Sequence, residues 1–147
     1  MARVIKDSGW SREIKQLLER VTVTVGIHEQ DASRKIDDGL SNAVLGFWHE
    51  YGTSRAPQRS FLRSTYDRKE DEYRRFFKAA MARAARRGKR IRALDLVGMK
   101  IAADVKETIR AHIPPPNAPE TIAKKGSSTP LIDSGELLNS IDYQVSE

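Results

Sequence analysis

The chain has 147 residues, a hydrophobic fraction of 39%, a net charge of +6 and no cysteine. This size predicts one domain, spanning residues 1–147, with enough apolar side chains to form a core. The composition excludes disulfides, thiol catalysis and thiolate zinc sites, and no apolar run approaches the roughly 20 residues that cross a bilayer.

The N-terminal part of the chain predicts a helix followed directly by a strand. The first ten residues contain no signal-peptide core, so we expect the protein to stay in the cytoplasm where it is made. Apolar residues recur three to four positions apart over residues 10–21, which is one helical stripe. Val and Thr alternate over residues 21–25, as in a strand with one buried face. Residues 29–39 are polar and predict a surface loop.

Residues 40–53 predict a helix with one apolar face and a C-terminal cap at Gly52. The residues that share the apolar face are Val44, Phe47, Trp48 and Tyr51. A basic loop over residues 53–60 follows, and its Pro57 disfavours helix at the residue before it.

Two long helices are predicted in the middle of the chain. Residues 61–88 place acidic residues early and arginine late, which is the order that the helix dipole favours. Thr65 or Asp67 is the expected N-cap of this helix, and Gly88 its expected end. Residues 93–113 carry a continuous apolar stripe, and three prolines end that helix. The stripe consists of Leu94, Val97, Ile101, Val105, Ile109 and Ile113.

The C-terminal part predicts a long loop, a short helix and a last strand. Residues 114–130 are rich in Pro, Gly and Ser, and such a loop in a small domain is usually functional or orders on a partner. Asp133 and Glu136 have the spacing of a capping box. Residues 141–147 predict a strand whose expected partner is residues 21–28.

The predicted fold class is therefore α+β. We expect a helix-rich single domain with a small antiparallel or mixed sheet, several amphipathic helices and long Pro/Gly-rich loops. Because two strands alone do not form a stable sheet, either further strands exist or neighbouring subunits complete the sheet.

The sequence lacks the signatures of a metal site or an active site. His49 and Glu50 match the start of a zinc-protease helix, but Thr53 stands where the second histidine is needed. His28 and His112 are isolated, so we interpret His49 as a helix-face or interface residue. The carboxylate pairs lie in polar runs, where ordinary acidity makes a poor general acid at neutral pH. We expect no enzyme activity, no catalytic residue, no metal and no cofactor.

The densest basic run, residues 83–92, is a candidate interaction site. Its cations could neutralise the phosphates of a nucleic acid, dock on an acidic protein surface, or only solvate a helix end, and the sequence leaves these alternatives open. No aromatic residues alternate with the arginines, as a platform for single-stranded nucleic acid requires. The basic residues of the run are Arg83, Arg86, Arg87, Lys89, Arg90 and Arg92.

A second basic segment surrounds Pro57 and contains Arg55, Arg59 and Arg63. We expect their guanidinium groups to be exposed, in a loop that orders against a partner. An ordinary surface loop is the alternative interpretation.

Two stretches, in this order, resemble a pattern of tailed-bacteriophage proteins. The first, FWHEYGTSRAPQRSFLRSTYD at residues 47–67, has a helix end, Tyr-Gly-Thr, a loop with Pro, and Phe-Leu-Arg. The second, at residues 114–145, has Thr-Ile-x-x-Lys-Gly, Pro-Leu-x-Asp-Ser-Gly-x-Leu and Ser-Ile. Together they resemble tail-completion and head–tail joining (neck) proteins, including minor tail protein Z-like virion morphogenesis proteins. The chain departs from that pattern at Ser60, where the family commonly has Pro, and in the basic run 83–92.

The resemblance implies structural work in the virion rather than catalysis. It implies a homo-oligomeric ring, commonly six-fold, between head-closure or connector proteins and the tail tube or terminator proteins. DNA would pass through the lumen without sequence-specific binding, and no membrane would be involved. The alternative is a nucleic-acid-binding protein that uses residues 83–92.

Under this interpretation the basic loop and the 114–130 segment contact the neighbouring proteins. The expected contact residues are Arg55, Arg59, Arg63, Lys124 and Lys125. Charge reversal at Arg55 and Arg59 is then expected to block joining while the monomer stays folded.

Overall fold

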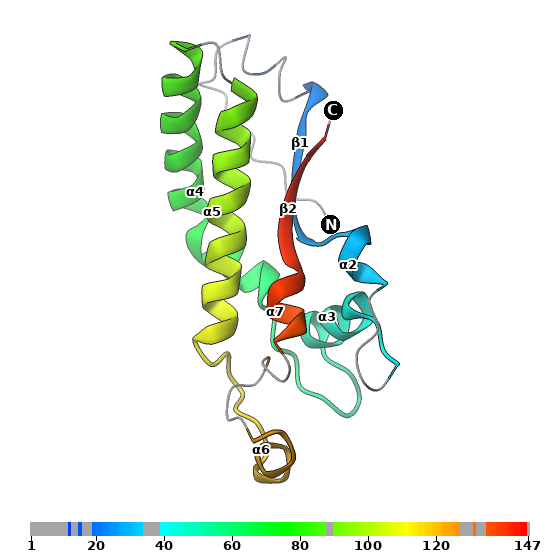
Figure 1. Ribbon diagram of the computed structural model, residues 1–147. Coiled ribbons are helices and arrows are strands. Elements are labelled where there is room, and N and C mark those ends of the chain that lie inside the picture. Colours follow the sequence, from blue (N-terminus) through cyan, green and yellow to red (C-terminus); the bar gives the residue numbers. More distant parts are fainter. Residues whose placement is uncertain are drawn as a thin grey trace.

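Figure 1 shows the protein as a computed structural model, with a long helical hairpin beside a two-stranded sheet and shorter helices toward one end. The described residues are 12, 15, 19–33, 39–87, 90–126, 131 and 135–146. The predicted α+β class is confirmed, because the domain is rich in helix and holds a two-stranded antiparallel sheet. Most of the helix predicted for residues 10–21 lies outside the described ranges, although residues 12, 15, 19 and 20 are helical.

The two strands are β1 (Thr22–Ile27) and β2 (Ile141–Ser146), which come from nearly opposite ends of the sequence. They pair antiparallel, with Val25 opposite Tyr143, so the predicted partnership is confirmed. Helix α5 (Arg90–Arg110) packs along this sheet. The backbone of α5 comes close to β2 at Gly98, where an added Cβ would lie 2.4 Å from the Tyr143 ring.

Helix α4 (Leu62–Ala85) lies antiparallel to α5 and forms the helical hairpin (Figure 1). The predicted stripe of α5 does form core, since Leu94, Val97, Val105 and Ile109 are each at most 5% exposed. The helix itself is shifted three residues toward the N-terminus and ends at Arg110 rather than at Ile113. Gly88, the expected end of α4, lies outside the described ranges.

The short helices are α2 (Glu29–Ala32), α3 (Asn42–Tyr51), α6 (Pro119–Lys125) and α7 (Glu136–Ser140). Of these, α3 and α7 contribute residues to a second core cluster below the sheet, whereas α6 lies apart from it (Figure 1). The cluster joins the two ends of the chain to the hairpin. Its buried members are Phe61, Val105, Ile109, Leu131, Leu137 and Ile141.

Two loop expectations need correction, and one expected helix cap lies outside the described residues. Residues 29–39 begin with the single turn α2, and residues 34–38 lie outside the described ranges. The segment 114–130 contains helix α6, because Pro119 suits the first turn of a helix and Gly126 closes it in the left-handed conformation. The predicted capping box cannot be placed, since Asp133 is not described; α7 begins after Gly135 without a side-chain cap.

Candidate functional site

Glu50, in the last turn of α3, holds the start of α4. The residue is 5% exposed. Its Oε2 atom accepts the backbone N–H groups of Phe61 and Leu62, each at 2.9 Å, and Oε1 accepts the N–H of Arg63 at 3.1 Å. The carboxylate thereby satisfies N–H groups that a helix start leaves free, and its charge complements the positive end of the helix dipole. The expectation that Thr65 or Asp67 caps this helix is wrong.

The Glu50 carboxylate is a structural cap that also binds a hydroxyl of the loop. Oε1 also accepts the hydroxyl of Ser60 at 2.6 Å, which brings a serine and a carboxylate together. Both carboxylate oxygens already accept backbone N–H groups as well, so the hydrogen-bond acceptors of Glu50 are occupied in holding the chain. The pair therefore explains the geometry of the loop at the start of α4.

The loop between α3 and α4 folds back on the end of α3. Gly52 caps the helix, as predicted, with its N–H bonded to the carbonyl of Trp48 at 2.7 Å. The Gln58 side chain donates to the carbonyl of Glu50 at 2.9 Å, and the N–H of Arg59 donates to the carbonyl of His49 at 2.8 Å. The loop is thus tied to its own helix at several points.

Arg59 is buried and structural, which overturns the expectation of an exposed guanidinium. It is 6% exposed. Its Nε donates to the carbonyl of Pro115 at 2.8 Å and a terminal nitrogen donates to the carbonyl of Pro116 at 3.1 Å. Burial lowers the pKa of this guanidinium. Charge reversal at Arg59 therefore tests the folding of this junction, and only Arg55 remains suitable for a charge-reversal test of joining.

Replacing Arg59 with alanine is expected to lower the free energy of unfolding by about 3 kcal/mol, because two hydrogen bonds from a charged group are lost. R59K should recover less than half of the loss, since an ammonium cannot reproduce the planar two-bond geometry. Urea unfolding at neutral pH measures both effects. R55A, in the same loop but exposed, is the matched control and should stay within about 0.5 kcal/mol of the parent. Equal midpoints for R59A and R55A would contradict the assignment.

An aromatic face covers the outer side of α3. The inner side buries Asn42, Gly46 and Glu50. The outer side exposes Val44 (39%), Phe47 (60%), Trp48 (39%) and Tyr51 (54%), and these four residues are called the aromatic face below. Taking about 200 Å² for each aromatic side chain, the three rings expose roughly 300 Å², comparable to the largest apolar patch of a typical monomer.

Arg63 links the aromatic face to a polar groove. Its guanidinium carbon lies 5.8 Å from the centre of the Tyr51 ring, and the rings of Phe47 and Tyr51 are 4.8 Å apart. Arg63 also lines a groove of about 480 Å³ between the start of α4 and the end of α5. The polar lining residues are Gln58, Ser60, Arg63, Ser64, Asp67, Arg68 and Thr108. Face and groove thus form one continuous surface of aromatic, cationic and hydrogen-bonding groups.

The acidic groups between α4 and α5 are engaged in ion pairs. Asp104 accepts from Lys69 at 2.9 Å and from Lys100 at 3.0 Å, and Lys100 also pairs with Glu72 at 2.8 Å. Burial acts to raise the pKa of Asp104, but the bonds from the two lysines outweigh it and lower that pKa. Burial, together with the Asp104 charge, raises the pKa of Tyr73. These contacts fasten the hairpin and leave Asp104 ionised at neutral pH.

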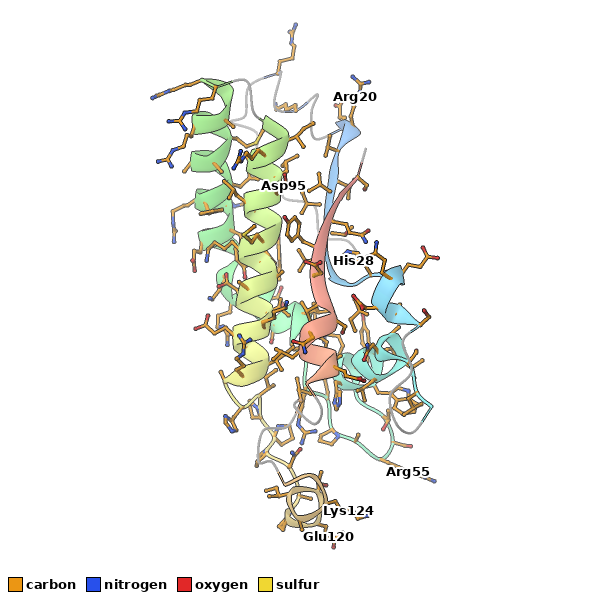
Figure 2. All side chains as sticks on the ribbon, viewed as in Figure 1. Arg20, His28, Arg55, Asp95, Glu120 and Lys124 are labelled. Atoms are coloured by element: carbon orange, nitrogen blue, oxygen red, sulfur yellow. The ribbon has the colours of Figure 1, made fainter. Side chains whose placement is uncertain are left out.

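The basic run lies at the opposite end of the molecule from the Pro57 loop. Arg83, Arg86 and Arg87 are exposed at the end of α4, and Arg92 is exposed in the first turn of α5. Arg20, just before β1, lies at this same end (Figure 2). Lys89 lies outside the described ranges, as does the side chain of Arg90, the first residue of α5.

The remaining predicted contact residues lie at the other end. Figure 2 shows Arg55 on its loop and Lys124 on α6 at the end of the molecule away from Arg20. Both are exposed, while the side chain of Lys125 is not described. The predicted basic residues therefore form two groups at opposite ends of the molecule, the basic run at one end and Arg55 and Lys124 at the other. Arg59 belongs to neither group because it is buried.

Within the described ranges, no three His, Cys, Asp or Glu residues gather where they could hold a metal ion. No helix of the described part of the chain is long and apolar enough to cross a membrane. Comparisons of the chain with protein-family models, curated proteins and solved structures found no match in any of the three. The resemblance described above therefore rests on the motifs at residues 47–67 and 114–145 alone.

Proposed function

We propose that the protein is a structural virion component that forms a homo-oligomeric ring at the head–tail junction of a tailed bacteriophage. In this role it completes the tail and joins the tail tube to head-closure or connector proteins. The observation that carries the proposal is the exposed aromatic face of α3 and its neighbour Arg63, held in place by the Glu50 cap.

The composition of this surface favours contact with another protein. Tyr, Trp, Phe and Arg are the residue types enriched at protein interfaces and at their energetic hot spots. The face also has a firm support, because Glu50 and Arg59 bind the loop beside it to α4 and to the segment after α5. The first stretch of the phage-like pattern, residues 47–67, contains most of the face, the cap and the loop.

The sheet supports assembly as well. Within the described residues β1 and β2 pair only with each other, so each strand keeps an outer edge that a neighbouring subunit can cover or extend. A ring needs such heterologous contacts, in which one surface of a subunit meets a different surface of the next. The aromatic face and the strand edges are two different surfaces of this kind.

Removing two aromatic side chains is expected to abolish joining. At about 2 kcal/mol for each hot-spot residue, W48A/Y51A should weaken the contact by roughly a thousandfold. The test supplies the variant to a phage that lacks this gene and examines the lysate by negative-stain microscopy. We expect filled heads lying apart from finished or overlong tails, as for the deletion itself.

The matched control is L96A/M99A, which removes two apolar side chains of α5 that are at least as exposed (47% and 54%) as Trp48 and Tyr51 (39% and 54%). It should give intact particles in normal number. Circular dichroism of both purified variants checks that they melt like the parent. Normal titre with W48A/Y51A would overturn the role of the face, and intact particles from the gene deletion would overturn the proposed function itself.

A further inference from the structure

We infer that the end of the molecule opposite the aromatic face is a second binding site. This site holds the phosphate backbone of duplex DNA without reading its sequence. The site is called the basic pole and consists of Arg20, Arg83, Arg86, Arg87 and Arg92. This inference does not rest on the ring, because the end of α4 and the beginning of α5 lie far from α3, which carries the aromatic face (Figure 1).

Three separate elements bring the arginines of the basic pole together. The end of α4, the beginning of α5 and the segment that leads into β1, which contains Arg20, lie at one end of the molecule (Figures 1 and 2). All five residues are exposed. None of the ion pairs in the described part of the chain involves them, whereas four acidic residues of the hairpin pair with Lys69, Arg74 and Lys100. These four are Glu70, Glu72, Asp104 and Glu107. Among the described residues, Glu19 and Asp95 lie within three sequence positions of these arginines, so the five cations still outnumber the carboxylates beside them in the sequence.

The helix dipole explains only part of this arrangement. A cation near a helix C-terminus is favourable, which accounts for Arg83 and Arg86 at the end of α4. Arg92 occupies the first turn of α5, where the dipole disfavours a cation, and that turn holds no acidic residue. A cation in an unfavourable position, without a carboxylate partner in the described chain, indicates a ligand with negative charge.

The chemistry of the basic pole favours a phosphate backbone over a protein or a single strand. A protein interface needs an apolar centre, but the only large exposed apolar side chain of the described residues 83–92 is Ile91. A single-strand site needs aromatic rings on which bases stack. The exposed rings of the described chain, Phe47, Trp48 and Tyr51, all lie on α3. Arginines with a single large exposed apolar neighbour, Ile91, and no exposed aromatic ring beside them suit the regularly spaced charges of duplex DNA.

The test is fluorescence anisotropy with the purified full-length protein and a labelled 30-bp duplex of random sequence, over 50–200 mM NaCl. If all five arginines contact phosphates, the logarithm of affinity should fall with the logarithm of salt with a slope of about −4.5. Affinity then drops roughly 500-fold across this range. R87A/R92A should reduce the magnitude of the slope by about two.

The matched control is R75A/R110A, which removes the same charge from exposed arginines elsewhere on the hairpin. It should leave the slope unchanged. R92A alone should weaken DNA binding without lowering the melting temperature, because the dipole disfavours this cation; a purely structural arginine would behave in the opposite way.

Equal slopes for R87A/R92A and R75A/R110A would overturn the inference. So would tighter binding of polyglutamate than of the duplex, since that result identifies an acidic protein surface as the partner. Because the assay uses neither virions nor assembled rings, its failure and the failure of the proposed function are distinguishable.

Discussion

Replacing Glu50 with alanine is expected to lower the free energy of unfolding by about 4 kcal/mol, because several donors lose their acceptor at once. Phe61 is 0% exposed, so its N–H group cannot turn to water when the carboxylate is gone. The N–H groups of Leu62 and Arg63 and the hydroxyl of Ser60 lose the same acceptor. Urea unfolding at neutral pH measures the loss.

The E50Q variant distinguishes the contribution of the size of the Glu50 side chain from that of its negative charge. Glutamine keeps the size of the side chain, but one oxygen is replaced by an NH₂ group that meets donors rather than acceptors. Its expected loss is about half that of E50A. E107A is the surface control, because the Glu107 side chain is 73% exposed, and it should stay within about 0.5 kcal/mol of the parent. A loss below about 1 kcal/mol for E50A would contradict the cap.

Glu50 both stabilises the fold and positions Arg63 beside the aromatic face. Tyr51 belongs to α3 and Arg63 to α4, and their cation–ring contact spans 5.8 Å. The Glu50 carboxylate accepts the N–H of Arg63 itself, so it sets the distance between these two helices. We therefore expect E50Q to weaken joining more than its modest effect on folding explains. The phage complementation assay described above measures that difference.

Local patterns were enough to predict most of the secondary structure. The alternation of Val and Thr in β1 and the stripe from Leu94 to Ile109 in α5 are properties of short windows, and both elements formed. The pairing of β1 with β2 could also be predicted, because the described sheet contains only these two strands. Helix α6 was not predicted, because it is only seven residues long, begins with proline and lies in a segment whose Pro, Gly and Ser content indicates a loop.

The functional surface depended on contacts that no local pattern contains. Periodicity showed that Phe47, Trp48 and Tyr51 share one face of α3, but not that this face is exposed. Hydrophobic residues usually lie inward, yet here the side with Asn42, Gly46 and Glu50 is buried. The reason is the Glu50 cap, which reaches residues eleven to thirteen positions further along the chain.

Arg59 illustrates the same limit for a charged residue. In sequence it resembles its neighbours Arg55 and Arg63, both of which are exposed as predicted. Its acceptors are carbonyl groups 56 and 57 positions away, and only the folded chain brings them within reach. A buried arginine is recognised by its partners, and the sequence near Arg59 does not contain them.

Replacing Gly52 with alanine is expected to lower the free energy of unfolding by about 3 kcal/mol, because backbone strain and a steric clash combine. Gly52 has φ 76° and ψ 172°, a region that is essentially restricted to glycine. A Cβ there would lie 2.9 Å from the backbone nitrogen of Gln58 and 3.3 Å from the carbonyl oxygen of Ala56. Neither is the end of a flexible side chain, so the loop itself must move.

The control for this substitution is G126A, because Gly126 also has a positive φ, 67°, but nothing lies within 4 Å of its added Cβ. G126A should lower the free energy of unfolding by only about 1 kcal/mol, which is the cost of placing alanine in the left-handed conformation. The difference between the two urea midpoints then reports the close approach of the Pro57 loop to the end of α3. Equal losses would mean that the loop is not held against Gly52, and the aromatic face beside it would lack the firm support that a ring contact requires.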